Sequence, residues 1–246
     1  MSRVGLITGC GKGIGLACLT EFLRSHPGNV ALGISRSTTP EIKALKKTYG
    51  NSFYFKEADI DDHEKINSFL EEFAKQIHLD FAICNAGVRS RISIGESTLE
   101  RYRQVIETNA ISQINIIKTI SAKRTSDSKH LNILVISSIV GQRGFEDLST
   151  YGVSKAALEG FVKSAAVELA QKNILINSLN PGFVKSSYEK KFLESNKKLY
   201  DWTLQQTPLG RWGECDEIAK IALFLTSESN TFMTGSVIYC DGGWTA

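Results

Sequence analysis

The sequence predicts a single doubly wound α/β domain, in which helices cover both faces of a parallel seven-stranded sheet. Short apolar, β-branched runs alternate along the chain with longer segments whose apolar residues have helical spacing. The short runs are apolar throughout, which is typical of parallel strands that are buried on both faces. No repeat, linker or change of composition divides the 246 residues. We therefore expect residues 1–246 to form one domain.

Each predicted element follows from its own run of residues. The strand candidates are residues 4–7, 30–34, 53–55, 79–84, 131–136, 174–179 and 237–239. The longest segments with helical spacing are residues 64–77 and 154–170, and a shorter one begins at Leu16. Ligands of such sheets bind beyond the carboxyl ends of the strands, so the residues that follow each strand are the first candidates for a site.

The composition excludes several classes of partner. Lys and Arg total 29 against 26 Asp and Glu, and this balanced charge gives no reason to expect nucleic acid. No apolar run approaches the roughly 20 residues that span a bilayer, and the first strand begins too early for a signal peptide. Five scattered cysteines without a C-x-x-C pair predict neither a disulfide framework nor a metal site. We expect a cytoplasmic protein with no metal, membrane or nucleic-acid partner.

A glycine-rich turn follows the first strand. It reads Thr8-Gly9-Cys10-Gly11-Lys12-Gly13-Ile14-Gly15, and a helix comes directly after it. Glycines let the backbone approach a pyrophosphate closely, and the helix N-terminus offers free N–H groups. A tight strand-to-helix turn without a ligand would use the same residues. The position at the start of the first βαβ unit favours dinucleotide binding.

The end of the second strand indicates which dinucleotide. NAD-binding sites carry Asp or Glu there to bind the ribose 2′-hydroxyl, whereas this chain has Ser35-Arg36. A guanidinium pairs with a 2′-phosphate, which a carboxylate would repel. Lys12 adds a second positive charge within the glycine turn. Arg36 alone is also compatible with an ordinary surface arginine, but together with the missing acid it predicts NADP(H).

Three polar side chains are candidates for acid–base chemistry. Tyr151 and Lys155 are four residues apart, which places both on one face of a helix. A nearby ammonium group lowers the pKa of a tyrosine and suits it for proton transfer to an alcohol oxygen. Ser138 follows the fifth strand, where a hydroxyl can bind a substrate carbonyl. Each residue taken alone is equally compatible with an ordinary surface pair or a local backbone contact.

Together these motifs resemble the short-chain dehydrogenase/reductase family, in order along nearly the whole chain. The resemblance implies a Rossmann-type fold and cofactor contacts at Gly9, Gly11, Lys12, Gly13, Ile14, Gly15, Arg36, Asp59, Ile60, Asn85, Ala86, Gly87, Tyr151, Lys155, Pro181, Gly182, Val184 and Ser186. Asp59 resembles the acid that contacts the adenine, and Pro181-Gly182 resembles the turn beside the nicotinamide. Ser186 stands where the family often has threonine, and it keeps the hydroxyl. Asp241-Gly242-Gly243 resembles the C-terminal signature.

The resemblance also implies a mechanism carried by a tetrad, Asn109, Ser138, Tyr151 and Lys155. A hydride passes from the nicotinamide to a carbonyl carbon while Tyr151 protonates the oxygen as general acid. Ser138 orients and polarises the carbonyl. Lys155 lowers the tyrosine pKa and binds the nicotinamide ribose, and Asn109 holds a water that connects Lys155 to solvent.

The substrate pocket of this family is formed by three segments, here residues 88–94, 139–150 and 183–212. The third predicts a short helical lid that excludes water, and it is rich in aromatic residues: Phe183, Tyr188, Phe192, Tyr200, Trp202 and Trp212. Arg89, Arg91 and Arg143 are candidates for binding an anionic group of the substrate. Each is equally compatible with a solvated surface arginine.

Within the family, the chain is most similar to 3-oxoacyl-(acyl-carrier-protein) reductases, including residues 208–213. This similarity favours a 3-oxoacyl thioester, and Lys129 and Lys172 fall where those enzymes dock the acidic carrier. The charged loop at residues 142–147 favours the alternative of a polar, sugar-derived or other small carbonyl metabolite. A non-catalytic NADPH-binding sensor or scaffold is the alternative of another class. The family usually assembles through its catalytic helix and last strand, so we expect a homotetramer or a dimer.

Overall fold

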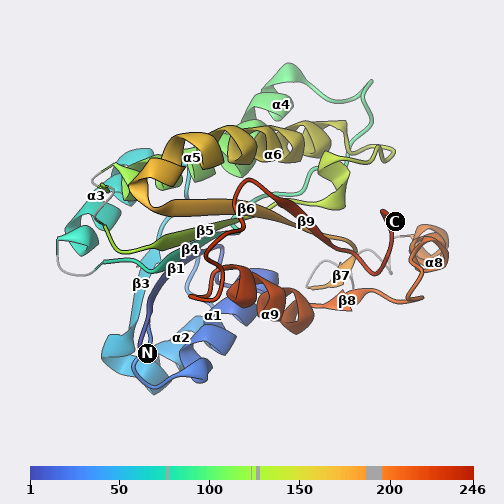
Figure 1. The fold of residues 1–246 in the computed structure, drawn as a ribbon. Coiled ribbons are helices and arrows are strands. Elements are labelled where there is room, and N and C mark those ends of the chain that lie inside the picture. Colours follow the sequence, from blue (N-terminus) through green and yellow to red (C-terminus); the bar gives the residue numbers. More distant parts are fainter. Residues whose placement is uncertain (76–77, 123, 126–127, 187–195) are drawn as a thin grey trace.

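The seven apolar runs form the seven strands of one parallel sheet in the computed structural model (Figure 1). The strands are β1 (Val4–Thr8), β2 (Val30–Ser35), β3 (Phe53–Glu57), β4 (Phe81–Cys84), β5 (Leu131–Ile136), β6 (Ile174–Pro181) and β9 (Val237–Cys240). Their order in the sheet is β3-β2-β1-β4-β5-β6-β9, so the direction of winding reverses between β1 and β4. The predicted fold class is confirmed, and the reversal marks the place where such sheets bind ligands.

Eight α-helices lie in the part of the chain that the structure describes, which is residues 1–75, 78–122, 124–125, 128–186 and 196–246. They are α1 (Gly13–Ser25), α2 (Pro40–Tyr49), α3 (His63–Ala74), α4 (Leu99–Ile106), α5 (Ser112–Ser121), α6 (Ser149–Leu169), α8 (Lys197–Gln206) and α9 (Cys215–Leu225). Shorter turns are η1 (Gly50–Ser52), η2 (Glu107–Ile111), η3 (Ile139–Gly141) and η4 (Ala170–Lys172). None of these helices is long and apolar enough to cross a membrane.

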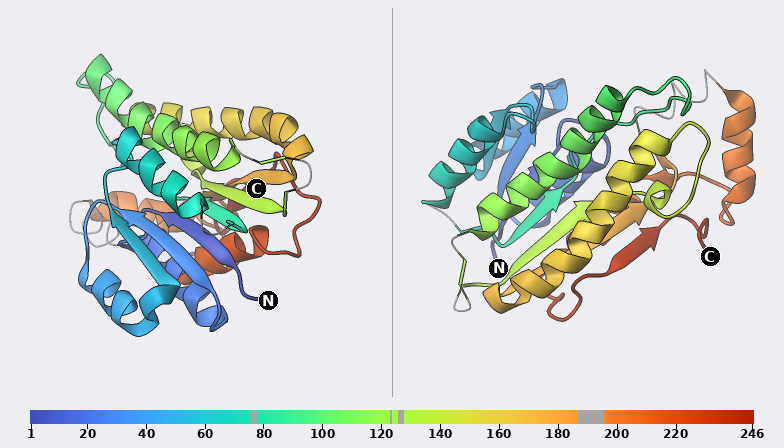
Figure 2. Two further views of the ribbon diagram at one scale, coloured as in Figure 1. Left: turned by 90° about the vertical axis from the view of Figure 1, so that its left-hand side faces the viewer. Right: turned by 90° about the horizontal axis from the view of Figure 1, so that it is seen from above.

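The helices form one layer on each face of the sheet (Figures 1 and 2). Helices α3, α5 and α6 bury their apolar sides with Leu6 and Leu32 on one face. Helices α1, α2 and α9 pack with Ile7 on the other face. Neighbouring residues of β1 thus enter different cores because successive side chains of a strand point to opposite faces. This double burial explains why the strands are apolar throughout.

Beyond the carboxyl ends of the strands lies a smaller assembly of α8, the C-terminal segment and a two-stranded sheet of β7 (Val184–Lys185) and β8 (Gly213–Glu214) (Figure 1). Of these parts, β7 and α8 belong to the segment 183–212 that the sequence predicts as a lid. The predicted lid residues Tyr188 and Phe192 lie outside the described residues.

Two element boundaries differ from the prediction, and the first of them lies at the site. Helix α6 begins at Ser149 rather than at residue 154, so Tyr151 already lies in its first turn. The fourth strand begins at Phe81 rather than at residue 79, because the preceding Asp80 accepts a hydrogen bond from the backbone N–H of Val4 at 2.7 Å. Apolar periodicity places the middle of a helix better than its polar first turn.

Candidate active site

The glycine turn after β1 has a shape that requires glycine. Gly9 has φ +64° and Gly13 has φ +59°, both in the left-handed region. A Cβ on Gly15 would lie 2.3 Å from the carbonyl oxygen of Gly9. The N-cap residue Lys12 makes no side-chain capping bond to α1, so the first N–H groups of that helix are not used by its own cap. Such a bare helix start beside a close-packed turn fits the pyrophosphate of a dinucleotide.

The segment after β4 fastens the same turn from the other side. The backbone N–H of Asn85 donates to Thr8 Oγ1 at 3.0 Å, and the side-chain amide of Asn85 donates to the carbonyl oxygens of Thr8 and Gly9 at 3.1 and 3.2 Å. Thr8 is completely buried. These bonds span the point where the winding of the sheet reverses, and they fix the floor of the cleft.

A cleft of about 710 Å³ runs along these strand ends. It brings together nearly all the predicted cofactor residues, namely Gly9, Gly11, Lys12, Gly13, Ile14, Arg36, Asp59, Ile60, Asn85, Ala86, Gly87, Tyr151, Lys155, Pro181, Gly182, Val184 and Ser186. Gly15 does not line the cleft, because it lies in α1 packed against Gly9 and Asn85. At the end by β2 the exposed Lys12 and Arg36 supply two positive charges near Asp59.

Three of the predicted tetrad residues line the middle of the cleft. Ser138 follows β5, Tyr151 lies in the first turn of α6, and Lys155 lies one turn later. Ser138 lies close enough to Tyr151 to act on the pKa of its phenol and to lower it. The Lys155 ammonium lies 5.7 Å from the centre of the Tyr151 ring and donates to the carbonyl oxygen of Ile136 at 2.8 Å. The helical spacing therefore does place both side chains on one face, as predicted.

The electrostatics of Tyr151 differ from the expectation that Lys155 lowers its pKa. Burial raises the pKa of Tyr151, and the charge of Arg89 and the side chain of Ser138 oppose this rise only in part. Burial also lowers the pKa of Lys155 to about 8, against the charge of Glu159. The correction has a chemical consequence, because a raised pKa keeps Tyr151 in the protonated form that a general acid needs.

Asn109, the fourth tetrad residue, lies behind the cleft rather than in its lining. The π-helical turn η2 between α4 and α5 carries it inward, where it is completely buried. Its side chain accepts from the N–H of Val88 at 2.7 Å and donates to Val88 O at 2.8 Å and Ser154 Oγ at 2.9 Å. These bonds give Asn109 a structural role in joining the segment after β4 to α6, and its part in a proton relay stays a prediction.

An aromatic cluster closes the end of the cleft away from Arg36. Phe183 lies 5.1 Å from both Trp212 and Trp244, measured between ring centres, and Phe145 lies 5.8 Å from Trp244. Trp212 is fully buried and donates to Thr203 Oγ1 at 2.8 Å, which fastens α8 to the cluster. The position of Trp244 in this cluster was not predicted, because nothing in its local sequence shows that the C-terminal segment returns to the cleft.

Some residues that line the cleft lie outside the family's motifs and were not predicted, among them Ser37, Thr39 and Thr108. Thr39 had a local signal, since Thr before Pro40 is a typical helix start, and its hydroxyl accepts from the N–H of Ile42 at 3.4 Å. The same hydroxyl donates to Gly11 O at 3.2 Å, which draws the start of α2 to the glycine turn.

The basic residues proposed for substrate binding do not all reach the cleft. Arg89 lines it and acts on Tyr151, whereas Arg91 pairs with Asp147 at 3.8 Å and Arg143 is absent from the lining. Lys129 and Lys172 precede β5 and β6, at the amino edge of the sheet, and Lys129 pairs with Asp80. The opposite edge holds the cleft, so these two lysines do not flank the site of their own chain.

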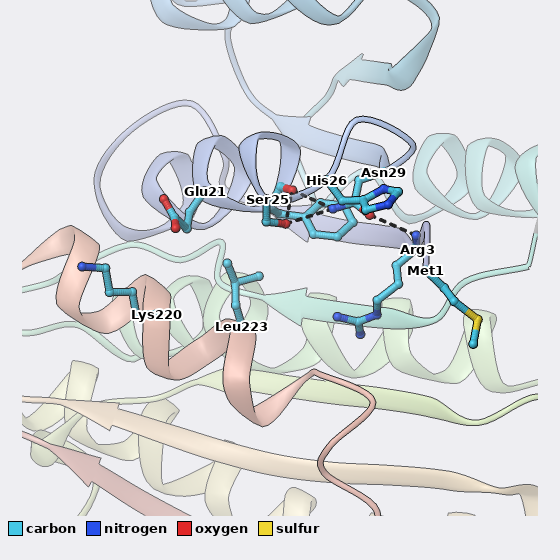
Figure 3. A pocket seen from close by; sticks show the side chains of 9 residues that line it. Met1, Arg3, Glu21, Ser25, His26, Asn29, Lys220 and Leu223 are labelled. Carbon is cyan, nitrogen blue, oxygen red and sulfur yellow. Dashed lines mark hydrogen bonds between the residues drawn. The ribbon is translucent and has the colours of Figure 1, made fainter.

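A second cavity, of about 450 Å³, opens at that amino edge between α1 and α9 (Figure 3). Its polar side chains are engaged locally: His26 accepts from the N–H of Gly28 at 3.0 Å, and Asn29 accepts from the N–H of Arg3 at 3.0 Å. Nothing in it matches a predicted functional residue. Over the described ranges, no group of three or more His, Cys, Asp or Glu side chains is placed to hold a metal ion.

Comparisons with known proteins agree with this geometry. The family model described as enoyl-(acyl carrier protein) reductase matches residues 9–245. The 3-oxoacyl-(acyl-carrier-protein) reductase FabG of Aquifex aeolicus is 31% identical over 244 residues, which cover 98% of this chain and 96% of that protein. The chain belongs to the short-chain dehydrogenase/reductase family. Like the reductases that it resembles, it is an oxidoreductase.

Solved structures of the family superpose over almost the whole chain. The structure of ElxO with NADP bound has a TM-score of 0.89 and 32% sequence identity, and the match covers 99% of both chains. A 4-hydroxyisoleucine dehydrogenase mutant, complexed with NADH and succinate, has a TM-score of 0.91 and 25% identity. The match covers 99% of this chain and 98% of the dehydrogenase. The present chain thus shares the fold of these proteins over nearly its whole length.

Proposed function

We propose that this protein is an NADP(H)-dependent reductase that converts a ketone into a secondary alcohol. One observation carries the proposal: Ser138, Tyr151 and Lys155 share a single cleft with the glycine turn. The first three supply proton transfer and carbonyl binding, and the turn supplies a dinucleotide site. A cleft with the glycine turn alone would have supported dinucleotide binding. A cleft with the three polar side chains alone would have supported a reaction such as hydrolysis.

The charges at the β2 end of the cleft support NADP(H) over NAD(H). Arg36 and Lys12 line this end, and the strand ends in Ser35 rather than in a carboxylate. Asp59, from the segment after β3, lines the same cleft, and in this proposal it contacts the adenine of the cofactor. ElxO, a close structural relative, has been solved with NADP bound. In this proposal Arg36 and Lys12 pair with the 2′-phosphate.

The chemistry divides between the cofactor and the protein. The bound nicotinamide supplies the hydride. Tyr151 donates its phenolic proton to the carbonyl oxygen, and its raised pKa keeps that proton available at neutral pH. Ser138 donates a hydrogen bond to the same oxygen and polarises the carbonyl group. Lys155, buried beside Tyr151, binds the ribose of the cofactor and supports the return of a proton to Tyr151.

A 3-oxoacyl thioester is the substrate that we favour. Phe183 and Trp212 form an apolar wall at the substrate end of the cleft, which suits an acyl chain. The Aquifex relative bears the name of a 3-oxoacyl reductase and matches along its whole length. Carrier docking through Lys129 and Lys172 of the same chain lacks support, because both lie at the far edge of the sheet. The thioester is therefore proposed without a docking surface for its carrier.

The substitution Tyr151→Phe tests the proposal. We expect NADPH consumption with acetoacetyl-coenzyme A to fall by about 10²–10⁴-fold, the usual contribution of a general acid. NADPH affinity, measured by fluorescence titration, should stay within about threefold of the wild type. Equal turnover in both proteins would refute the assignment of Tyr151. Absence of turnover in the wild type, with NADPH still bound, would instead favour the alternative of a non-catalytic NADPH-binding sensor, to which the phenol is irrelevant.

A small anionic carbonyl metabolite is the second candidate substrate, and Arg89 favours it. Its side chain lines the cleft near enough to Tyr151 to act on the tyrosine charge. An arginine beside the reacting carbonyl can bind a carboxylate or phosphate of the substrate. The test compares a short 2-oxo acid with its methyl ester in the wild type and in Arg89→Met. Preference for the acid that disappears in the variant would decide for this candidate over the thioester.

We also propose that the protein assembles as a homotetramer. Large apolar side chains are exposed on two faces, among them Val153 on α6 and Phe232 before the edge strand β9. Ala156 and Ala157 are exposed on α6 as well, whereas Ala165 of the same helix is buried. Two such faces produce four-chain assemblies by two-fold symmetry. Light scattering after size exclusion checks this, and a stable monomer would contradict it.

A further inference from the structure

Glu159 is a buried carboxylic acid that the mechanism above does not use. It lies on α6 one helical turn beyond Lys155 and is 2% exposed. Acidic side chains are almost never fully buried unless other groups compensate them, because a charge loses its hydration there. The partners of Glu159 therefore show what the position is for.

Both oxygens of Glu159 accept hydrogen bonds from other side chains. Oε1 accepts from Asn180 Nδ2 at 2.6 Å and from Ser137 Oγ at 3.2 Å. Oε2 accepts from the side-chain amide of Gln142. Asn180 ends β6 just before Pro181, and Ser137 follows β5. The carboxylate thus joins α6 to the ends of β5 and β6.

The same network reaches the backbone of Ser138. Asn180 Nδ2 also donates to the carbonyl oxygen of Ser138 at 3.2 Å, and Asn180 Oδ1 accepts from Ser178 Oγ at 2.8 Å. Because a carbonyl oxygen can only accept, this contact fixes the amide orientation and makes Asn180 a donor to Glu159. Amide donors on both oxygens are the arrangement of an ionised carboxylate.

Glu159 is also the charge that acts on Lys155. Burial disfavours the ammonium form of Lys155, and the negative charge of Glu159 opposes that effect. The other nearby charges affect the pKa values of other residues. Arg89, from the segment after β4, affects the pKa of Tyr151. Arg143 and Asp241 affect the pKa of Tyr239 in β9. Glu159 acts on Tyr239 too, from the α6 side. Removing Glu159 therefore leaves Lys155 with burial alone.

We propose that Glu159 is a positioning residue of the reduction, whose carboxylate keeps Lys155 in its charged form and holds the ends of β5 and β6 around the cleft. The assignment rests on the proposed function, because it concerns the lysine that binds the ribose and supports the proton of Tyr151. It explains how a lysine that is only 4% exposed retains its charge at neutral pH. A purely structural Glu159 would support the strand ends without affecting that charge.

The first test follows the charge of Lys155 directly and needs no substrate. Protein labelled with carbon-13 at the lysine ε position is titrated by NMR, and the Lys155 signal is assigned with Lys155→Met. In the wild type we expect Lys155 to titrate near the pKa of about 8 that results from its burial and the opposing charge of Glu159. In Glu159→Gln, which keeps the shape but removes the charge, its pKa should fall by about one unit, a tenfold change in the ionisation constant.

The second test follows the reaction. Reduction of acetoacetyl-coenzyme A needs charged Lys155, so the alkaline limb of kcat should move about one pH unit lower in Glu159→Gln. Activity at pH 6, where Lys155 is charged in both proteins, should change far less. The matched control is Gln142→Leu, which removes a partner of Glu159 but no charge, and should leave the limb in place.

The outcomes separate the two proposals. A Lys155 signal that titrates identically in the wild type and in Glu159→Gln overturns the inference, whatever the activity. A lowered pKa without wild-type turnover of any ketone supports the role of Glu159 and overturns the proposed reduction alone. If Glu159→Gln does not fold, the double variant Glu159→Leu with Gln142→Leu removes the charge and its amide partner together. Failure of both variants to fold would leave Glu159 a structural residue and overturn its electrostatic role.

Discussion

The two ends of the cleft are built in different ways. At the β2 end, the backbone of one turn is held by the adjacent strands, as when Gly9 N–H donates to Ile34 O at 2.8 Å. At the aromatic end, side chains from separate segments meet, and Phe183, Trp212 and Trp244 lie far apart in the sequence. The first construction needs particular residues at fixed spacing, whereas the second needs only rings that reach a common place. The cofactor end therefore has a motif and the substrate end has none.

Among the substitutions that test this difference between the two ends of the cleft, Gly15→Ala is expected to have the largest effect. The new Cβ would lie 2.3 Å from Gly9 O, so the turn must shift, and we expect unfolding free energy to fall by about 1–3 kcal/mol. NADPH binding should weaken together with stability, because the same backbone provides both. Chemical denaturation and cofactor titration measure the two effects. Gly95→Ala, where the Cβ meets nothing within 4 Å, is the control. Wild-type behaviour of Gly15→Ala would show that the turn is not rigid.

A smaller and more selective effect is expected from Arg36→Gln. Loss of one charged partner at an exposed position should weaken NADPH binding by about tenfold, or about 1.4 kcal/mol, and leave NADH binding unchanged. Competition titrations with both cofactors give this ratio. Arg24→Gln, an exposed arginine near the end of α1, should change neither affinity. Equal weakening of both cofactors would mean that Arg36 supports the turn rather than the phosphate.

The smallest effect is expected at the aromatic end, from Trp212→Phe. This change removes the hydrogen bond to Thr203 and loosens α8, so KM for acetoacetyl-coenzyme A should rise while NADPH affinity stays unchanged. A lost hydrogen bond of about 1 kcal/mol corresponds to roughly a fivefold rise. Trp202→Phe, at a ring that is 41% exposed, should have less effect. If Trp212→Phe weakened NADPH binding equally, the two ends would not be independent.

Sequence patterns predicted the fold and the cofactor end of the site because both depend on short-range constraints. A buried parallel strand must be apolar along its whole length, and the turn at Gly9 and Gly13 needs residues that tolerate positive φ. The inward position of Asn109 was not predicted, because it depends on a π-helical turn that no local composition specifies. The direction of the Tyr151 pKa shift was wrong because burial outweighs the neighbouring charges, and burial is a property of the folded chain.

Glu159 is another residue whose position in the fold could not be predicted from the local sequence. It lies in the strongly helical run after Lys155, where an acidic residue is expected to be solvated. Only the packing of α6 against the ends of β5 and β6 shows that this position faces inward. A periodic pattern identifies the apolar face of a helix, but it cannot show that a polar residue on that face has partners.

The return of the C-terminal segment to the cleft has a practical consequence for handling the protein. Trp244 packs against Phe183 and Phe145, so a fusion partner or affinity tag joined after Ala246 would lie beside the aromatic end of the cleft. Met1 lines the other cavity, at the opposite edge of the sheet (Figure 3). Purification tags, surface immobilisation and fluorescent reporters therefore belong before Met1. The neighbourhood of Trp244 offers instead an intrinsic fluorophore that can report on substrate entering the cleft.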